Sequence, residues 1–173
     1  MTDINLTLRQ ARFEDATALI ALLNQLGQET EFMSFDRFGM GLNPEILGSH
    51  LESLAASSHQ LLLVAEMDTE LVAVASISGD NDPRVRHIGE VGIGVLQEYW
   101  GLGLGSLLME ELLDWAESSE ELFRLELKVQ VQNIRGRRLY EKFGFELEAR
   151  MPRGARSDNG NFLEVDLMSL LLH

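Results

Sequence analysis

Three glycines at alternate positions, Gly101, Gly103 and Gly105, form the segment of this sequence best suited to bind an anion. The sequence reads YWGLGLG over residues 99–105, after an apolar stretch at 87–96 and before a helical pattern that begins at Leu104. Regular helices and strands disfavour such spacing, because glycine weakens both. A glycine-rich turn between a strand and a helix instead presents bare backbone N–H groups beside the positive end of the helix dipole. The segment therefore predicts a phosphate-binding loop.

Three kinds of phosphate site use loops of this type. The dinucleotide fingerprint G-x-G-x-x-G is disfavoured, because the sixth position from Gly101 is Ser106 and the expected strand ends five residues before the first glycine. The mononucleotide P-loop is excluded, because no Lys-Ser/Thr pair follows Gly105. The third kind is a cradle for the pyrophosphate of coenzyme A.

Two stretches carry a resemblance that favours the third kind. The segment HIGEVGIGVLQEYWGLGLGSLLMEEL (87–112) resembles the acetyl-CoA-binding segment of the GNAT superfamily of N-acetyltransferases, whose loop reads Gln/Arg-x-x-Gly-x-Gly/Ala. Trp100 stands where Gln or Arg is usual, so contacts here are expected from backbone N–H groups. The stretch NIRGRRLYEKFGF (133–145) is similar to the family's Asn-x-x-Ala-x-x-Leu-Tyr-x-Lys-x-Gly-Phe, with Gly136 in place of alanine. The resemblance covers roughly residues 87–148.

The elements that must position these residues follow from hydrophobic periodicity. The pattern predicts a single α/β domain over residues 1–173, with one mixed sheet flanked by helices, and the resemblance implies the mostly antiparallel GNAT acyl-CoA N-acyltransferase fold. We expect strands at the N-terminus, on both sides of a turn at Asp68-Thr69, and over 87–96, 122–131, 145–151 and 162–171. We expect helices from about Phe13, from Pro44 to about Ala56, from Leu104 to about Ser118, and from the N-cap Asn133 to Gly144.

Composition restricts the chemistry and the partners. The 173 residues include no cysteine, which excludes disulfides, thiolate zinc sites and a cysteine nucleophile. The 28 acidic against 14 basic residues give a net charge of −14, which disfavours nucleic acid as a partner. Nine of the 14 basic residues lie between Arg124 and Arg156, which suggests an anionic ligand bound there. With no signal pattern and no apolar run of bilayer length, we expect a cytoplasmic protein that has no membrane partner and no metal.

The resemblance assigns roles in binding acetyl-CoA. The pantetheine arm is expected to bond along the strand Val91–Leu96, where Gly92 and Gly94 leave room; the alternative is that these glycines let a helix pack on the sheet. A backbone N–H near Gly94 or Val95, in a strand that is bulged and splayed, would hold the oxyanion. The residues expected at the cofactor are Ile93, Gly94, Val95, Trp100, Gly101, Leu102, Gly103, Leu104, Gly105, Ser106, Asn133, Arg135 and Arg138. Asn133 also serves as a plain helix cap, and the arginines are equally explained as solvated side chains.

Two residues are candidates for moving protons. The resemblance places the hydroxyl of Tyr140 at the cofactor sulfur, where a phenol protonates the departing thiolate; the alternative is a core tyrosine packed on Leu139 and Phe143. Glu90 stands where several family members carry a glutamate that acts as base through water, and burial beside an apolar strand would make it a better base. Its alternative roles are an ordinary carboxylate or a charge that attracts the amine. His87 is a further candidate base.

The acceptor pocket is the least diagnostic part. The stretch GQETEFMSFDRFGMGLN (27–43) is acidic and aromatic, which suits a primary ammonium group on a small molecule or a protein N-terminus. Candidate substrate contacts are Glu29, Phe32 and Glu90, with Glu31, Phe35, Asp36 and Phe38 in the same stretch. We expect an N-acetyltransferase that works by direct attack in a ternary complex. A non-catalytic acetyl-CoA-binding sensor or partner module is the alternative, followed by a structural domain without a ligand. The apolar last strand is compatible with a homodimer or with a core position.

Overall fold

Eleven principal elements make up the computed structural model, which describes residues 4–30, 32 and 43–173. The strands are β1 (Leu6–Gln10), β2 (Leu61–Met67), β3 (Glu70–Ser78), β4 (Ile88–Val95), β5 (Arg124–Gln130), β6 (Glu146–Arg156) and β7 (Phe162–Leu171). The helices are α1 (Ala16–Glu29), α3 (Pro44–Ala55), α4 (Leu104–Ser118) and α5 (Ile134–Lys142), with short 3-10 turns at Phe13–Asp15 and Gln97–Tyr99. All the helices and strands expected from the sequence are present, and β6 continues five residues beyond the expected strand at 145–151.

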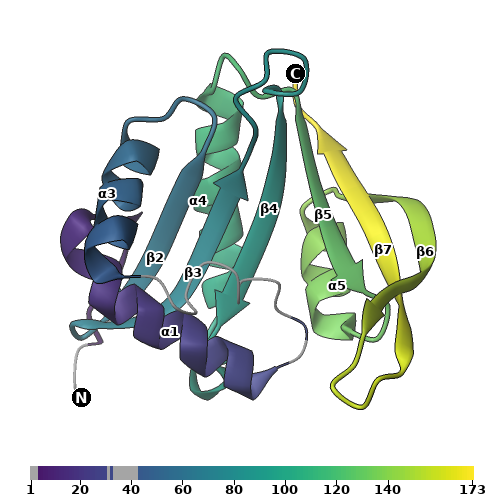
Figure 1. Cartoon of the computed structure of the whole chain (residues 1–173), viewed down its shortest axis with the longest axis horizontal. Helices are drawn as coiled ribbons and strands as arrows, with labels where there is room; N and C mark the ends of the chain where they lie inside the picture. Colours follow the sequence, from purple (N-terminus) through teal and green to yellow (C-terminus); the bar gives the residue numbers. More distant parts are fainter. Residues whose placement is uncertain (1–3, 31, 33–42) are drawn as a thin grey trace.

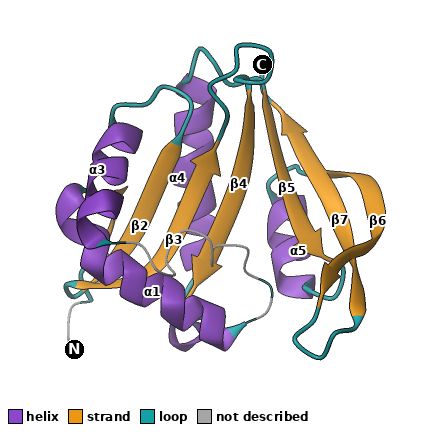
Figure 2. Cartoon of the chain, viewed as in Figure 1, coloured by secondary structure: helices purple, strands orange, loops and turns teal. Residues whose placement is uncertain are grey.

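The strands form one seven-stranded sheet in the order β1-β2-β3-β4-β5-β7-β6. Every neighbouring pair is antiparallel except β4 and β5, which run parallel. Helices α1 and α3 cover one face, and α4 and α5 lie on the other (Figures 1 and 2). The predicted fold class, a single mixed sheet flanked by helices, is confirmed. The last strand, β7, lies between β5 and β6, so the sheet itself explains its apolar residues.

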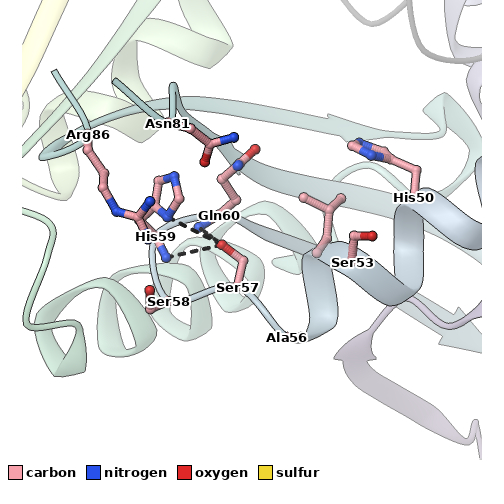
Figure 3. A pocket seen from close by; sticks show the side chains of 10 residues that line it. His50, Ser53, Ala56, Ser57, Ser58, His59, Gln60, Asn81 and Arg86 are labelled. Atoms are coloured by element: carbon pink, nitrogen blue, oxygen red, sulfur yellow. Dashed lines mark hydrogen bonds between the residues drawn. The ribbon is translucent and has the colours of Figure 1, made fainter. Parts of the chain in front are cut away.

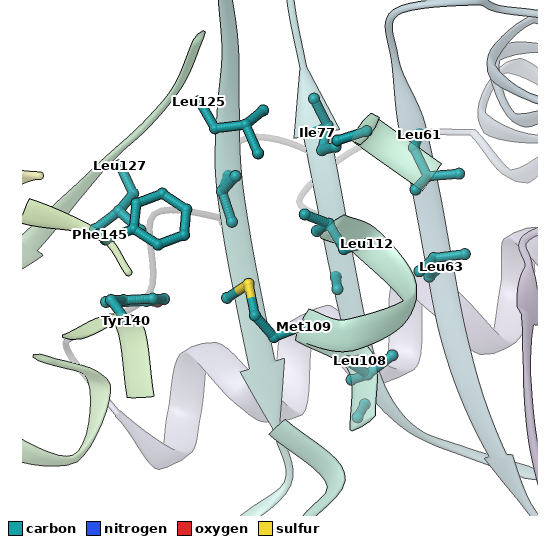
Figure 4. Close-up of a cluster of buried hydrophobic side chains, with 14 of the residues drawn as sticks. Leu61, Leu63, Ile77, Leu108, Met109, Leu112, Leu125, Leu127, Tyr140 and Phe145 are labelled. Atoms are coloured by element: carbon teal, nitrogen blue, oxygen red, sulfur yellow. The ribbon is translucent and has the colours of Figure 1, made fainter. Parts of the chain in front are cut away.

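Two hydrophobic clusters hold the helices to the sheet. One cluster joins α1 and α3 to the sheet through residues such as Leu19, Leu51 and Val74. The other joins α4, α5 and the opposite face, and it includes Leu108 and Tyr140 (Figure 4). In the described part of the chain, no helix has the length and apolar character needed to span a bilayer.

The sheet is split between β4 and β5. These strands pair only at Ile88 with Arg124, Gly89 with Leu125 and Glu90 with Glu126. Beyond the third pair, within residues 43–173, the edge of β4 from Val91 to Val95 has no partner strand on the β5 side, while its pairing with β3 continues to Val95. We call this opening, bordered by residues 91–95 of β4 and 127–130 of β5, the fork; Figure 1 shows the two strands diverging. The expected splaying of β4 is therefore present.

Candidate active site

The register of β4 decides which of its backbone groups face the fork. The Leu96 N–H donates to the Val72 carbonyl at 3.0 Å, and the register with β3 has no shift from Glu90 to Val95, so the expected bulge is absent from these pairs. Backbone groups alternate in direction along an antiparallel strand. The N–H and carbonyl groups of Ile93 and Val95 therefore face the fork, and those of Gly94 face β3. Of the two expected oxyanion donors, Val95 is the one that a ligand in the fork can reach.

The first two glycines of the loop form a bare helix N-terminus. Gly101 and Gly103 have φ of +82° and +80°, a conformation that side chains with a Cβ rarely adopt. A Cβ added to either would meet no atom within 4 Å, so the loop borders open space. Gly103 is the N-cap of α4 and accepts the first helical bond from the Leu107 N–H at 3.1 Å. The N–H groups of residues 104–106 precede that bond and have no acceptor within the helix. They are free to bind an anion.

The third glycine has different surroundings. Gly105 lies inside α4, and a Cβ there would make an ordinary van der Waals contact with the side chain of Leu139 at 3.4 Å, on neighbouring helix α5. Next to it, the Ser106 hydroxyl accepts a hydrogen bond from Lys142 Nζ at 3.0 Å, which joins the two helices. The Leu104 side chain is buried in the core, and the Leu102 side chain is exposed. In this loop, the backbone at Gly101 and Gly103 therefore faces the open space.

Trp100 makes contacts that the sequence does not predict. Its indole Nε1 donates to the Val95 carbonyl at 2.8 Å, and the Arg135 guanidinium lies 4.6 Å from the centre of its ring. Because Arg135 belongs to α5, this stack joins the loop after β4 to the helix after β5. Arg138 is exposed one turn further along α5.

The start of α5 explains the Gly136 substitution in the second motif. The Asn133 side chain accepts the Gly136 N–H at 3.0 Å, so the predicted N-cap is confirmed. A Cβ on Gly136 would lie 2.6 Å from Asn133 Nδ2, a distance at which one of the two must shift. The helix ends at Lys142, and Gly144, the predicted C′ residue, has φ of +93°.

Tyr140 is buried on α5 with its hydroxyl available. The side chain is 8% exposed and its ring packs edge-to-face on Phe145, with 6.0 Å between ring centres. Among the described residues no hydrogen bond reaches its hydroxyl, so this group can bond to a ligand. Burial raises the pKa of Tyr140 to about 12, which keeps the phenol protonated at neutral pH.

Glu90 lies at the closed end of the fork and is exposed, so the expectation that it is buried is wrong. Its direct partner on β5 is Glu126, and paired residues of parallel strands project to the same face. Gly92 and Gly94 share that face by the two-residue period, and neither adds a side chain that would cover the carboxylates. A pair of carboxylates therefore borders the fork on the face opposite α4.

The acceptor candidates are only partly described. Glu29 ends α1, and its Oε1 accepts the Gln97 N–H at 2.9 Å, so this carboxylate ties the helix to the loop after β4. Phe32 is 41% exposed. The other candidates of this stretch, Glu31, Phe35, Asp36 and Phe38, lie outside the described residues.

Among the described residues, ion pairs engage three of the nine basic residues of the segment 124–156, Arg124, Arg137 and Arg150. Arg124 binds both oxygens of Glu148, at 2.8 and 2.6 Å, and this hydrogen bonding lowers the pKa of Glu148 to about 2. The fully buried Asp166 accepts two hydrogen bonds from Arg150, which lower its pKa, and Arg137 Nε lies 3.2 Å away without hydrogen-bond geometry. The prediction of an anionic ligand from this segment therefore rests on the other six basic residues.

A polar pocket lies at the other end of the sheet, near the start of β2 (Figure 3). It has a volume of about 370 Å³ and is lined by residues that include His50, Gln60, Asn81 and Arg86. His59 in its wall is buried, and its Nδ1 lies 3.4 Å from the Ser57 hydroxyl. None of the residues expected at the cofactor or the acceptor lines this pocket.

Known proteins share this fold and this sequence pattern. The family model described as "Acetyltransferase (GNAT) family" matches residues 25–145. The L-amino acid N-acetyltransferase AaaT of Escherichia coli (strain K12) is 31% identical over 107 residues, which are 62% of this chain and 65%, just under two thirds, of that protein. The crystal structure of an acetyltransferase of the GNAT family from Streptococcus pneumoniae has a TM-score of 0.93 and 40% identity, and the match covers 97% of this chain and 100% of that one.

A further solved structure has the same fold in complex with a ligand. It is yncA of Salmonella typhimurium with its cofactor acetyl-CoA, which has a TM-score of 0.83 and 24% identity over 97% of this chain and 94% of that chain. The split sheet, the glycine loop at the start of α4 and the motif of α5 thus agree with the family match over most of the chain. The chain belongs to the GNAT family of acetyltransferases.

Proposed function

We propose that this protein transfers an acetyl group from acetyl-CoA to a primary amine, by direct attack in a ternary complex. The observation that carries the proposal is the fork: an unpaired strand edge that leads to a bare helix N-terminus. An extended amide chain can bond to the free N–H and carbonyl groups of Ile93 and to the N–H of Val95, while the Val95 carbonyl accepts the Trp100 indole N–H. A pyrophosphate can bind the N–H groups of residues 104–106, where the helix dipole favours negative charge.

Backbone groups supply the electrostatic part of the catalysis. The Val95 N–H faces the fork and can donate to an oxygen that gains negative charge when the amine attacks. A preorganised donor of this kind lowers the activation barrier by about 3 kcal/mol. The oxyanion role thus requires no particular side chain at Val95.

Tyr140 would act at the sulfur mainly as a hydrogen-bond donor. With the Tyr140 pKa near 12 and an ordinary thiol near 8.5, complete proton transfer from the phenol costs about 5 kcal/mol. A hydrogen bond to sulfur stabilises the developing thiolate without that cost. The proton that finally neutralises the thiolate is the one lost by the attacking amine, so that the amide and the free thiol form with no other co-reactant. Tyr140 either relays this proton or orients the sulfur that receives it.

The acceptor we propose is the amino group of an amino acid or a similar small amine. Glu90 lies at the closed end of the fork and offers its carboxylate to an ammonium group. Its register partner Glu126 is already paired with the Arg124 guanidinium at 3.0 Å. Because Glu90 is exposed, it can accept the proton of the amine through water before that proton reaches the thiolate. The relative named as an L-amino acid N-acetyltransferase supports this choice of acceptor.

Two measurements test the proposal. Isothermal titration calorimetry should show binding of acetyl-CoA, and a thiol-reactive dye should show CoA release with a panel of amino acids and simple amines. Double-reciprocal plots at several fixed amine concentrations should intersect, as a ternary complex requires. Parallel lines would contradict direct attack. Tight cofactor binding with no CoA release for any amine would favour the alternative, a non-catalytic acetyl-CoA-binding sensor or partner module.

A further inference from the structure

Trp100 bonds to a backbone group that a ligand in the fork would need. Its indole N–H donates to the carbonyl of Val95 at 2.8 Å. The register of β4 directs that carbonyl into the fork, away from β3. The carbonyl is the last acceptor on the open edge of β4 before the chain turns into the glycine loop. A side chain of the protein thus bonds to the acceptor at the mouth of the fork.

Arg135 covers one side of the Trp100 indole, and solvent reaches the other parts of this side chain. The Arg135 guanidinium covers the indole ring at 4.6 Å, and the Trp100 side chain remains 39% exposed. A single neutral hydrogen bond and a cation–π contact at the surface are each modest interactions in water. A ligand that brings its own amide N–H to the Val95 carbonyl can therefore displace the indole, which has solvent to move into.

We propose that Trp100 is a positioning residue that occupies the Val95 carbonyl in the free protein and releases it to an amide N–H of the pantetheine arm. The inference rests on the proposed function, because it requires a CoA thioester in the fork. Trp100 thereby lowers the affinity for the donor and distinguishes ligands that carry a pantetheine arm from ligands that carry only the nucleotide. Arg135, freed from the ring, remains beside the glycine loop.

Fluorescence can follow this exchange, because the chain has only two tryptophans. Trp115→Phe leaves Trp100 as the single emitter, and Trp100→Phe leaves Trp115, which packs on the core from α4. Saturating CoA should change the emission of Trp115→Phe, since the indole loses its hydrogen bond and its guanidinium cover. Adenosine 3′,5′-bisphosphate, which has no pantetheine arm, should leave that emission unchanged. The emission of Trp100→Phe should change little with either compound.

Calorimetry with CoA gives the second readout. Trp100→Phe keeps a ring for Arg135 but removes the indole N–H, so it should bind CoA roughly two- to tenfold more tightly than the wild type, the range expected for one net hydrogen bond. Arg135→Ala should shift the affinity in the same direction by less, and Trp115→Phe should bind as the wild type does. A fall in affinity for Trp100→Phe would overturn the proposal, because Trp100 would then assist binding.

The two levels of the proposal fail in different ways. Binding of CoA by calorimetry with no emission change in Trp115→Phe would refute the role of Trp100 and leave the transferase function intact. An equal emission change with adenosine 3′,5′-bisphosphate would also refute it, because the phosphates alone would then move the indole. Absence of CoA binding in the wild type would contradict the proposed function itself. The Trp115→Phe titration does not depend on whether Trp100→Phe folds.

Discussion

Gly103→Val separates two costs of a side chain at the start of α4: backbone strain and loss of the anion site. Gly103 has φ of +80°, where a β-branched residue is strained by about 1–3 kcal/mol. A Cβ at this position meets no atom within 4 Å, so strain is the whole cost to the free protein. For a domain of this size the melting temperature should fall by about 2–4 °C for each kcal/mol.

The effect on donor binding should be much larger. To relieve the strain, the loop must rotate the peptide groups that start the helix, and the N–H groups of residues 104–106 then lose their common direction. A hydrogen bond to a charged group contributes about 1.5–3 kcal/mol, so losing two of them costs about 3–6 kcal/mol. The Kd for acetyl-CoA should therefore rise by about 10²- to 10⁴-fold.

Gly160→Val is the matched control. Gly160 has φ of +84°, also meets no atom within 4 Å, and lies in the turn between β6 and β7, away from the glycine loop. Both variants should lose similar stability in thermal unfolding, but calorimetry should show a loss of affinity for acetyl-CoA only in Gly103→Val. If the two variants lose stability equally and both bind the donor as the wild type does, the assignment of the anion site to this loop is refuted.

Three further predictions concern single contacts. The Glu148–Arg124 pair stabilises the fold above the ordinary glutamate pKa and loses this effect as pH falls from about 4.5 to about 2. Glu148→Gln should therefore flatten the pH dependence of the free energy of unfolding in that window. An unchanged slope would contradict the pairing. Gly136→Ala should stabilise the protein by about 1 kcal/mol in an Asn133→Ala background and by clearly less in the wild type, where the new Cβ meets the capping side chain; equal gains in denaturant unfolding would exclude the clash. Glu90→Gln should raise the KM of the amine at least severalfold and leave the Kd of acetyl-CoA nearly unchanged, and steady-state kinetics with an equal loss for both substrates would argue against an acceptor role.

Local sequence patterns were sufficient to predict the helices, the strands and the glycine loop. Periodicity gave α4 with both ends correct, and the alternation along β5 gave its buried and exposed faces. These features depend on neighbours within a few residues. The insertion of β7 between β5 and β6 depends on pairing across the whole C-terminal third, and no local pattern encodes it.

The site was less predictable, because contacts between residues distant in sequence determine the exposure and the partners of its side chains. The apolar character of its strand favours burial of Glu90, but the side chain is exposed at the last pair between β4 and β5. The cluster of basic residues suggested a ligand, but Glu148 and the buried Asp166, which are distant in sequence or on other strands, neutralise several of them. The contact between Trp100 and Arg135 joins residues 35 positions apart on separate elements, so only the structure reveals it.

The position of β7 also determines when during synthesis the sheet can be completed. The strands β1 to β4 pair with their sequence neighbours, so this half can form while the remainder of the chain is still emerging from the ribosome. Strands β5 and β6 do not pair with each other, and both take β7 as their partner. They must wait with unpaired edges until residues 162–171 have been translated, and contacts of such sequence separation form slowly. The nascent chain is therefore most exposed to misassociation while β5 and β6 lack this partner.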